Sequence, residues 1–394
     1  MNTVPAHVLD DPAMAWIYLR RVIEASHLII NQLLDTGLPV TDIAHSIREA
    51  HPRLPDSLRS VTDARRGWDP RRDAELADRA GWRLITSADP HWPVHFTQPF
   101  ATMELNIQHL NSSIRGLRHA PFAVWAKGPG KLAELTKCAI TVVGTRDISR
   151  YGQQVAGQWA SDFASQGYTV VSGGADGVDA ACHRAALAAG TPTIVVMAGS
   201  LDKPYPARNI RMFDQIVEAG GLVMSEYPPG TAPARHRFLT RNRLAASLGG
   251  ATVVMEAALR SGALNTLNWA NAMSKPTFAV PGQVTSVVAQ GCLKAIQDQK
   301  AQLARVPADV TGALDAAIGM QLELNMDRDS GPSLGWEETA VFDATGLHAT
   351  GSAEGTAEAI QVDTGLPMPR VIRHLRTLEN AGMVKRVGSK WLKV

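Results

Sequence analysis

Residues 140–174 read ITVVGTRDISRYGQQVAGQWASDFASQGYTVVSGG, and this stretch decides the fold. The apolar run at 139–143 is rich in β-branched residues, which is typical of a buried strand. Apolar residues at helical spacing follow over 155–163, and a second apolar run occupies 168–171. The order strand, helix, strand predicts two parallel strands joined by a crossover helix.

Both predicted strands end in short Gly-rich loops. The first loop is Gly144-Thr145-Arg146 and the second is Ser172-Gly173-Gly174. In an open parallel sheet, the loops at the carboxyl ends of the strands form the binding crevice. Backbone N–H groups at the start of the following helix favour an anion such as phosphate. The sequence therefore predicts an anion site at this edge of the sheet.

The alternation continues to residue 282 and predicts an α/β fold. Apolar strands rich in Val, Ile and Met alternate with helices, which indicates a parallel sheet covered on both faces, a Rossmann-like doubly wound core. The expected helices span 176–189, 208–219, 240–248 and 263–273; the expected strands span 193–197, 222–224, 251–255 and 277–280, and PFAVWAKG at 121–128 is expected to be the first strand of the core.

Flanking segments predict two further modules. Residues 1–80 are expected to form an N-terminal helical module with a connector, and residues 81–315 the core. Asp, Gly and Pro cluster within 316–336, which favours a linker. Residues 337–394 then show two helices followed by a hairpin, the pattern of a winged helix.

Composition excludes several classes of protein. The chain has 394 residues, 45% of them apolar and 19% charged, with a net charge of +2, so overall charge favours no particular partner. Three cysteines without paired spacing indicate neither a disulfide framework nor a cysteine-based metal site. The N-terminus lacks the features of a secretory signal, and no apolar run approaches membrane-spanning length. We therefore expect a cytoplasmic protein.

Two nucleotide-binding fingerprints are absent. The G-x-G-x-x-G pattern does not follow the first strand of the βαβ unit, and Ser172 stands where an acidic residue would bind a ribose. The chain also lacks G-x-x-x-x-G-K-[ST], so no Walker loop is predicted. No cofactor and no metal are expected.

Several motifs together resemble the DNA-processing protein A (DprA, or Smf) family. The resemblance covers roughly residues 122–303, and it implies a non-enzymatic, homodimeric protein that binds incoming single-stranded DNA and loads the RecA recombinase during natural transformation. The matching motifs are GTR-x-x-S-x-YG (144–152), SGGADGVDAACH (172–183), LDKPYPARN (201–209), SEYPPG (225–230), FLTRNRLAASL (238–248), VVMEAALRSGALNT (253–266) and FAVPG (278–282).

The second candidate binding site is a cluster of basic residues that contains Phe238. Its basic residues are Arg235, Arg237, Arg241 and Arg243. Basic side chains can follow a DNA backbone while a ring stacks on a base, whereas the alternative is a solvated helix start with Phe238 in the core. The family resemblance favours the first interpretation and implies DNA or phosphate contacts from Gly144, Thr145, Arg146, Ser149, Ser172, Gly173, Gly174, Lys203, Arg235, Phe238, Arg241, Asn242 and Arg243.

For Arg146 the residues alone leave two readings open. Its guanidinium can donate two hydrogen bonds to a phosphate beside a helix start, or it can pair with neighbouring Asp147. The family resemblance favours phosphate.

Asp179 and His183 are four residues apart on one helical face, but neither a nucleophile nor a metal ligand accompanies them in the sequence. We expect structural roles for both. Glu256 at the end of a strand is a candidate base, a ribose ligand, or a residue that fixes the loop at Ser261-Gly262. No catalytic residue is predicted.

Two other functions stay open. A nucleotide-processing hydrolase of the lysine-decarboxylase-like phosphoribohydrolase type would need a P-G-G-x-G-T-x-x-E loop, which Arg260-Ser261-Gly262-Ala263 does not supply. A regulator acting through the winged helix is the other alternative. Basic residues on that module (Arg370, Arg373, Arg376, Lys385, Arg386, Lys390 and Lys393) fit a duplex DNA surface, and a protein-docking role is equally open.

Overall fold

The computed structural model describes residues 5–24, 27–105, 119–318, 334–346 and 355–394. The chain divides into two compact units, Met1–Gln321 and Leu322–Val394. Within the described ranges, no helix has the length and hydropathy needed to cross a membrane. The predicted boundary between residues 80 and 81 falls inside the first unit and stays a prediction, and most of the predicted linker at 316–336 lies outside the described residues.

A mixed, mostly parallel sheet forms the centre of the first unit. In the described residues its order is β1-β2-β6-β5-β4-β3-β7-β8-β9, and every pair from β6 to β9 is parallel. The strands are β1 (Trp82–Thr86), β2 (Ala123–Lys127), β3 (Ala139–Val143), β4 (Thr169–Ser172), β5 (Thr193–Val196), β6 (Leu222–Ser225), β7 (Ala251–Val254), β8 (Thr277–Ala279) and β9 (Gln302–Leu303).

One edge of the sheet differs from the predicted parallel arrangement. The segment 121–128 forms β2, which pairs antiparallel with β6 on one side and with β1 on the other. No crossover helix in the pattern connects β2 to a parallel neighbour, and an antiparallel partner needs none. The predicted parallel sheet is therefore correct from β6 to β9 and wrong at the β1–β2 edge.

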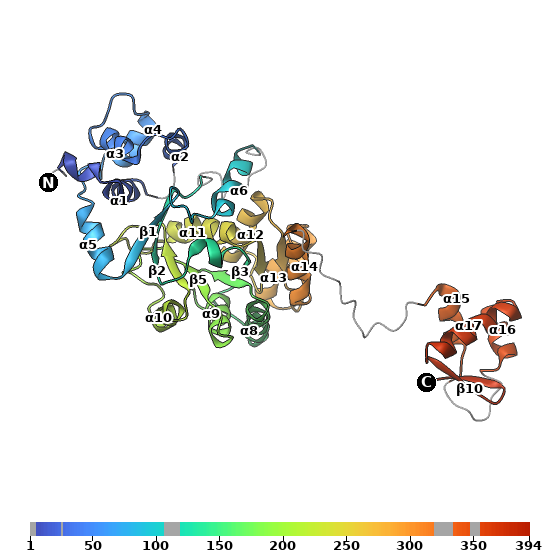
Figure 1. The fold of residues 1–394 in the computed structure, drawn as a ribbon. Coiled ribbons are helices and arrows are strands. Elements are labelled where there is room, and N and C mark those ends of the chain that lie inside the picture. The colour runs from blue at the N-terminus through green and yellow to red at the C-terminus, as the bar shows by residue number, and fades with distance from the viewer. Residues whose placement is uncertain (1–4, 25–26, 106–118, 319–333, 347–354) are drawn as a thin grey trace. The chain divides into compact units, whose positions relative to one another are not determined.

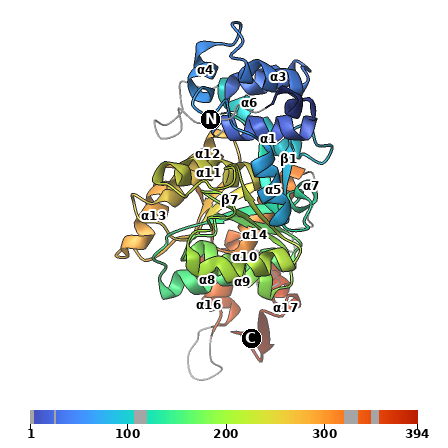
Figure 2. The same cartoon turned by 90° about the vertical axis from the view of Figure 1, so that its left-hand side faces the viewer.

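Helices cover both faces of the sheet (Figures 1 and 2). One face carries α8, α9 and α10, with α14 packed beside α8; the other carries α6, α11 and α12, and α13 packs near β8. These helices are α6 (Val94–Leu105), α8 (Arg150–Ser165), α9 (Val178–Ala188), α10 (Ile210–Glu218), α11 (Arg235–Leu248), α12 (Gly262–Ala272), α13 (Gln290–Gln297) and α14 (Pro307–Ile318); short helical segments are α7 (Leu132–Leu135), η3 (Ala207–Asn209) and η4 (Val287–Ala289).

The N-terminal helices pack against the β1–β2 edge. Their apolar side chains form a core with Phe122 and Ala123, which lie where β2 begins. Leu9, Tyr18 and Leu19 in this core are fully buried. The segments are η1 (Ala6–Asp10), α1 (Pro12–Val22), α2 (Leu28–Asp35), α3 (Val40–Arg48), α4 (Asp56–Thr62) and α5 (Arg71–Arg79), which confirms the predicted helical character of this part of the chain.

The second unit contains helices and a hairpin close to the predicted ranges. Helix α17 (Met368–Asn380) buries Val371, Leu375 and Leu378 against α15 (Trp336–Asp343) and α16 (Ala357–Thr364). The strands β10 (Val384–Val387) and β11 (Lys390–Lys393) form an antiparallel hairpin. The apolar stripe of α17 explains its packing, because these residues recur every three to four positions.

Candidate nucleic-acid interface

Two adjoining cavities lie at the carboxyl ends of the parallel strands. The smaller one, about 400 Å³, is lined by the loops after β3 and β4 and by α11. The larger one, about 960 Å³, lies between the loop before α11 and helices α12 and α13. Arg146, Phe238, Leu239 and Arg260 line both cavities. The crevice predicted for this edge of the sheet is therefore present. Residues from α11, α12 and α13 line it in addition to the two Gly-rich loops.

The loop after β3 lines the smaller cavity with residues 144–147. A Cβ atom at Gly144 would overlap Val178, so glycine lets this loop pack closely against α9. The amide of Thr145 donates to the carbonyl of Glu256 at 2.7 Å. Gly144, Thr145 and the exposed Arg146 line the smaller cavity.

Ser149 has a different role from the predicted phosphate contact. It caps α8, and both its amide and its hydroxyl donate to the Glu256 carboxylate, at 3.0 and 2.5 Å. A carboxylate thus already occupies the positive end of α8, where an anion would be favoured. This geometry makes Glu256 hold the end of the loop after β3 and the start of α8, a different segment from the loop at Ser261-Gly262 that the sequence analysis considered.

Of the predicted segment Ser172-Gly173-Gly174 after β4, Gly173 alone lines a cavity, and Ala175 further along the loop also lines the smaller one. The Ser172 hydroxyl is buried and donates to the carbonyl of Val142 at 2.6 Å. The carbonyl of Gly174 accepts a hydrogen bond from the side-chain Nδ2 of Asn209 at 3.1 Å, and Gly174 lines neither cavity. Gly173 lines the smaller cavity.

Helix α11 brings the basic residues and the aromatic ring to the site. It begins at Arg235, five residues before the predicted start at Thr240. Arg235 is exposed and lines the larger cavity, while Phe238 is half-buried between the two. The Arg146 guanidinium lies 4.9 Å from the centre of the Phe238 ring, and the Tyr205 ring meets it edge-on with centroids 5.7 Å apart. Phe238 therefore presents part of its ring to the cavity instead of lying in the core.

Arg241 and Asn242 form part of the floor of the smaller cavity. Arg241 is buried, and its Nη1 donates to the carbonyl of Gly173 at 2.6 Å and to that of Val196. Burial lowers the pKa of Arg241 and raises that of nearby Asp179, and each charge partly offsets the shift of the other. The Asn242 amide donates to Asn265 Oδ1 at 3.1 Å. Both side chains are fixed by the protein itself.

Five of the predicted residues line neither cavity: Ser149, Ser172 and Gly174, whose contacts are given above, and Lys203 and Arg243. Arg243 is fully buried and pairs with the buried carboxylate of Glu226, so its guanidinium points away from the site. Lys203 is exposed but lies outside both linings. The position of Arg243 follows from its side of α11, which faces Glu226 and the ring of Phe100.

Other lining residues were not among the predicted contacts. Arg260 and Ser261 precede α12 and follow β7, so the carboxyl-end rule used for β3 and β4 would have indicated them. Tyr205 lies within a motif quoted for the family resemblance. Lys294 and Lys300 carry no local signal, because only the packing of α13 brings them to the larger cavity.

The Asp179 and His183 pair serves the fold. The carboxylate of Asp179 accepts the Ala175 amide at 3.2 Å. The ring of His183 is fully buried against Thr193 Oγ1 at 2.9 Å, and burial lowers its pKa to about 3, so it is neutral at physiological pH. The described residues contain no group of three or more His, Cys, Asp and Glu side chains arranged to hold a metal ion.

A Rossmann-like sheet with guanidinium groups around a partly exposed ring at its carboxyl edge defines a class of proteins suited to nucleotides or nucleic acids. The chain belongs to the DNA recombination-mediator protein A (DprA/Smf) family, whose model matches residues 83–315.

One relative extends this match to nearly the whole chain, and others cover the larger part of it. A DNA processing protein DprA of Mycobacterium tuberculosis is 38% identical over 98% of this chain and 95% of its own length. The protein Smf of Escherichia coli is 29% identical over 67% of this chain and 70% of its own. The X-ray structure of DprA from Streptococcus pneumoniae superposes with a TM-score of 0.55 and 27% identity, covering 79% of this chain and 98% of that one.

Proposed function

We propose that this protein binds single-stranded DNA in the two cavities and acts as a recombination mediator without catalysing a reaction. The observation that carries the proposal is that Arg146, Arg235 and Arg260 line the larger cavity together with Phe238, with Arg146 over the face of the ring. A flexible strand offers phosphates to the cations and an unpaired base to the ring, whereas a duplex keeps its bases stacked inside.

Different groups in the cavities are proposed to contact different parts of the strand. Arg146 and Arg235 are exposed and supply charge for the phosphates. Gly144, Thr145 and Gly173 let the strand approach the backbone of the sheet edge. Stacking of a base on Phe238 contributes about 1–3 kcal/mol and is tolerant of sequence, because every base has a π-face. We expect little sequence preference.

The absence of catalysis is part of the same proposal. Two side chains that the sequence offered for acid–base chemistry are engaged within the protein: the Glu256 carboxylate accepts from Ser149, and His183 is buried and neutral. Glu256 contacts the end of the loop after β3, and His183 contacts Thr193 of β5 in the interior. The role proposed for Glu256 is therefore to keep the loop after β3 in position.

The wider role follows from membership in the family. We propose that the protein is cytoplasmic, protects incoming single-stranded DNA, and loads the RecA recombinase onto it in natural transformation or recombination. As a homodimer it would offer two binding sites to one strand, which raises the overall affinity through the high effective concentration of the second site.

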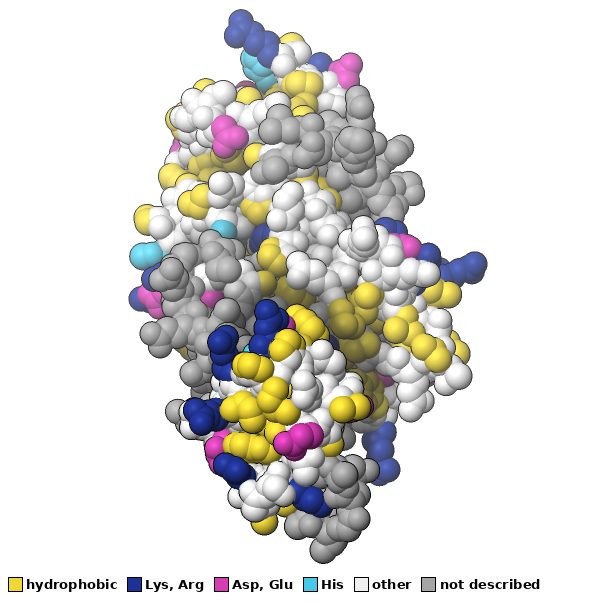
Figure 3. All heavy atoms as spheres, turned by 90° about the vertical axis from the view of Figure 1, so that its right-hand side faces the viewer, with side chains coloured by type: hydrophobic (Ala, Val, Ile, Leu, Met, Phe, Trp, Pro, Cys, Tyr) yellow, Lys and Arg dark blue, Asp and Glu magenta, His cyan; other side chains and the backbone are white. Residues whose placement is uncertain are grey.

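For the C-terminal unit we propose a winged helix that contacts duplex DNA. On this unit, Figure 3 shows Lys and Arg side chains beside hydrophobic ones. Arg373, Arg376, Lys385 and Arg386 are exposed on α17 and β10, whereas Arg370 pairs with Glu337 at 2.7 Å. In the full chain, Arg373→Glu with Arg376→Glu should weaken duplex binding and leave single-strand binding unchanged. Unchanged duplex binding would favour a protein-docking role instead.

The proposal is tested by fluorescence anisotropy with a labelled single-stranded oligonucleotide and a duplex control. Arg146→Ala and Arg235→Ala should each weaken single-strand binding by about tenfold, the order expected for a lost hydrogen bond to a charged group. Arg211→Ala on α10 is the matched control, because Arg211 is exposed and lies outside both cavity linings. Arg241 is a poor choice for this test, since its removal leaves buried carbonyls without a donor.

The salt dependence of single-strand affinity provides a second test of the proposed function. Affinity should fall steeply between about 50 and 200 mM salt, with a slope of roughly 0.7 per phosphate contact on a single strand. Single-strand binding that is equal in both variants and the unaltered chain would refute the proposal.

A further inference from the structure

The first turn of α11 lacks the features that normally stabilise a helix start. Ala234 provides no side-chain cap, and the first turn contains no acidic residue. Arg235, His236 and Arg237 occupy it instead. A helix N-terminus carries a partial positive charge and unsatisfied N–H groups, so three basic side chains there are unfavourable. Because this turn carries Arg235 and leads into Phe238, the proposed binding surface needs stabilisation from elsewhere.

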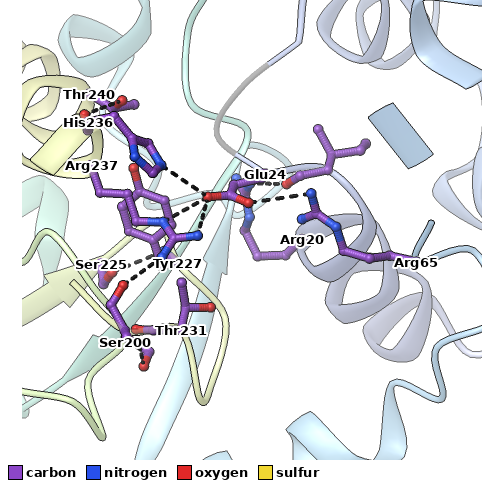
Figure 4. Close-up of polar contacts among 12 residues, drawn as sticks. Arg20, Glu24, Arg65, Ser200, Ser225, Tyr227, Thr231, His236, Arg237 and Thr240 are labelled. Atoms are coloured by element: carbon purple, nitrogen blue, oxygen red, sulfur yellow. Dashed lines mark hydrogen bonds and ion pairs between the residues drawn. The ribbon is translucent and has the colours of Figure 1, made fainter. Parts of the chain in front are cut away.

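An acid from the N-terminal helices supplies that stabilisation. Glu24 follows α1, and its carboxylate lies among basic groups of α11 (Figure 4). The Nε and Nη2 atoms of Arg237 lie 2.8 and 2.6 Å from Glu24 Oε1, and His236 Nε2 lies 3.9 Å from the same atom. Arg65, from the segment after α4, approaches the other carboxylate oxygen at 3.4 Å. Glu24 thus takes the place of the missing first-turn acid.

Arg237 extends this contact to the wall of the larger cavity. Its Nη1 donates to the carbonyl of Ala232 at 2.6 Å, and its guanidinium lies 5.3 Å from the centre of the Tyr227 ring. Pro233, Ala234 and Arg235, the next residues of the chain, line the cavity. The pair formed by Glu24 and Arg237 therefore fixes both the loop before α11 and its first turn.

A second ion-pair group on α11 has a different character. Glu226 lies between Arg243 and Arg20, at 3.6 Å from the latter, and all three are fully buried. Removal of one member would leave a buried charge and destabilise the whole fold. The side chains of Glu24 and Arg237 are 31% and 18% exposed. The charge of Glu24 can therefore be removed without leaving a fully buried, unpaired charge.

We propose that Glu24 is a positioning residue for strand binding, which couples the N-terminal helices to the cavity through Arg237. The inference rests on the proposed function, because it concerns how the same surface is held. Without the Glu24 charge, the first turn of α11 and the loop before it lose their fixed position, and Arg235 and Phe238 no longer meet the strand together.

The test compares Glu24→Gln with the unaltered full chain by single-strand anisotropy. We expect about three- to tenfold weaker binding, since an ion pair and a helix-end charge are both lost. Loss of a negative charge should by itself strengthen the binding of a polyanion such as DNA. Weaker binding by Glu24→Gln would therefore indicate that Glu24 positions the binding surface. Glu49→Gln is the matched control, because Glu49 lies in the same N-terminal module, is largely exposed, and pairs with Arg48 of that module. It should bind as well as the unaltered chain or slightly better.

Two further measurements separate positioning from a general loss of stability. Hydrogen exchange of the amides at 237–240 should accelerate in Glu24→Gln while exchange in α12 is unchanged, and Glu24→Asp should restore part of the affinity. Glu24→Gln added to Arg237→Gln should have little further effect, since the two residues act through one contact.

Each remaining outcome has a definite meaning. If Arg146→Ala weakens single-strand binding as expected while Glu24→Gln binds normally, the inference is wrong and the proposed function stands. Tighter binding by Glu24→Gln would also overturn it, since Glu24 would then compete with DNA for Arg237. If the unaltered chain binds no single strand, the proposed function and the inference both fall.

Discussion

Removal of the Phe238 ring separates stacking from charge in strand binding. The ring is half-buried, with Arg146 over its face and Tyr205 at its edge, so its truncation removes few core contacts. The loss of base stacking should cost about 1–3 kcal/mol. Because each 1.4 kcal/mol is tenfold in affinity, Phe238→Ala should weaken single-strand binding by about 5- to 150-fold.

The salt dependence of the same variant provides the sharper assay. Phe238→Ala should lower affinity at every salt concentration while leaving the slope unchanged, because no phosphate contact is lost. Arg146→Ala should instead reduce the slope by roughly 0.7. Phe238→Leu keeps an apolar side chain but has no π-face, so it should bind nearly as weakly as Phe238→Ala.

A matched control guards against a general effect of removing an exposed aromatic residue. Tyr151 on α8 is 50% exposed and lies outside both cavity linings, so Tyr151→Ala should bind like the unaltered chain. Single-strand affinity within twofold of normal in Phe238→Ala would refute the stacking argument. So would a leucine variant that binds normally, since apolar contact alone would then suffice.

Three further predictions concern the floor of the site and the fold around it. Gly173→Ala should abolish single-strand binding and lower stability by about 1–3 kcal/mol in urea unfolding, because the new Cβ would overlap the buried Arg241 guanidinium. Arg243→Met should destabilise the protein by about 3 kcal/mol, the order expected for one half of a buried ion pair, yet strand affinity of the folded protein should be unchanged, since Arg243 does not line the cavities. Burial lowers the pKa of Lys275 from 10.5 to about 7. Between those two values the unfolded state binds more protons than the folded state, so the free energy of unfolding should rise as pH increases from about 7 towards 10.5. Lys275→Met should remove that rise in urea titrations, and an unchanged pH profile would contradict the assignment.

Strand and helix positions in the core could be predicted because they depend on local pattern. Strand β3 spans 139–143 as predicted, and the helices after it begin and end within a few residues of their expected positions, α11 excepted. Buried parallel strands need continuous apolar residues, and crossover helices need one apolar stripe, so each element carries its own signal. The antiparallel β1–β2 edge carried none, since strand direction depends on which neighbour is available.

Helix α11 shows why the site was harder to predict than the sheet. Its basic and polar residues from 240 to 243 are all buried, so the helix lacks the apolar stripe that would indicate its inward face. Sequence reasoning treated Arg241 and Arg243 alike. The fold directs Arg241 to the floor of the smaller cavity and Arg243 to Glu226 on the other side.

By itself the sequence determined the α/β core, the Gly-rich loops at its carboxyl edge, and the family to which the chain belongs. Those features depend on short-range periodicity and on motifs that are contiguous in the chain. Only the tertiary structure decided which cations face the cavity, that Glu256 occupies the start of α8, and that Glu24 pairs with Arg237 across 213 residues. A charged side chain is placed by the partner that offsets its desolvation, and that partner is chosen by packing between distant elements.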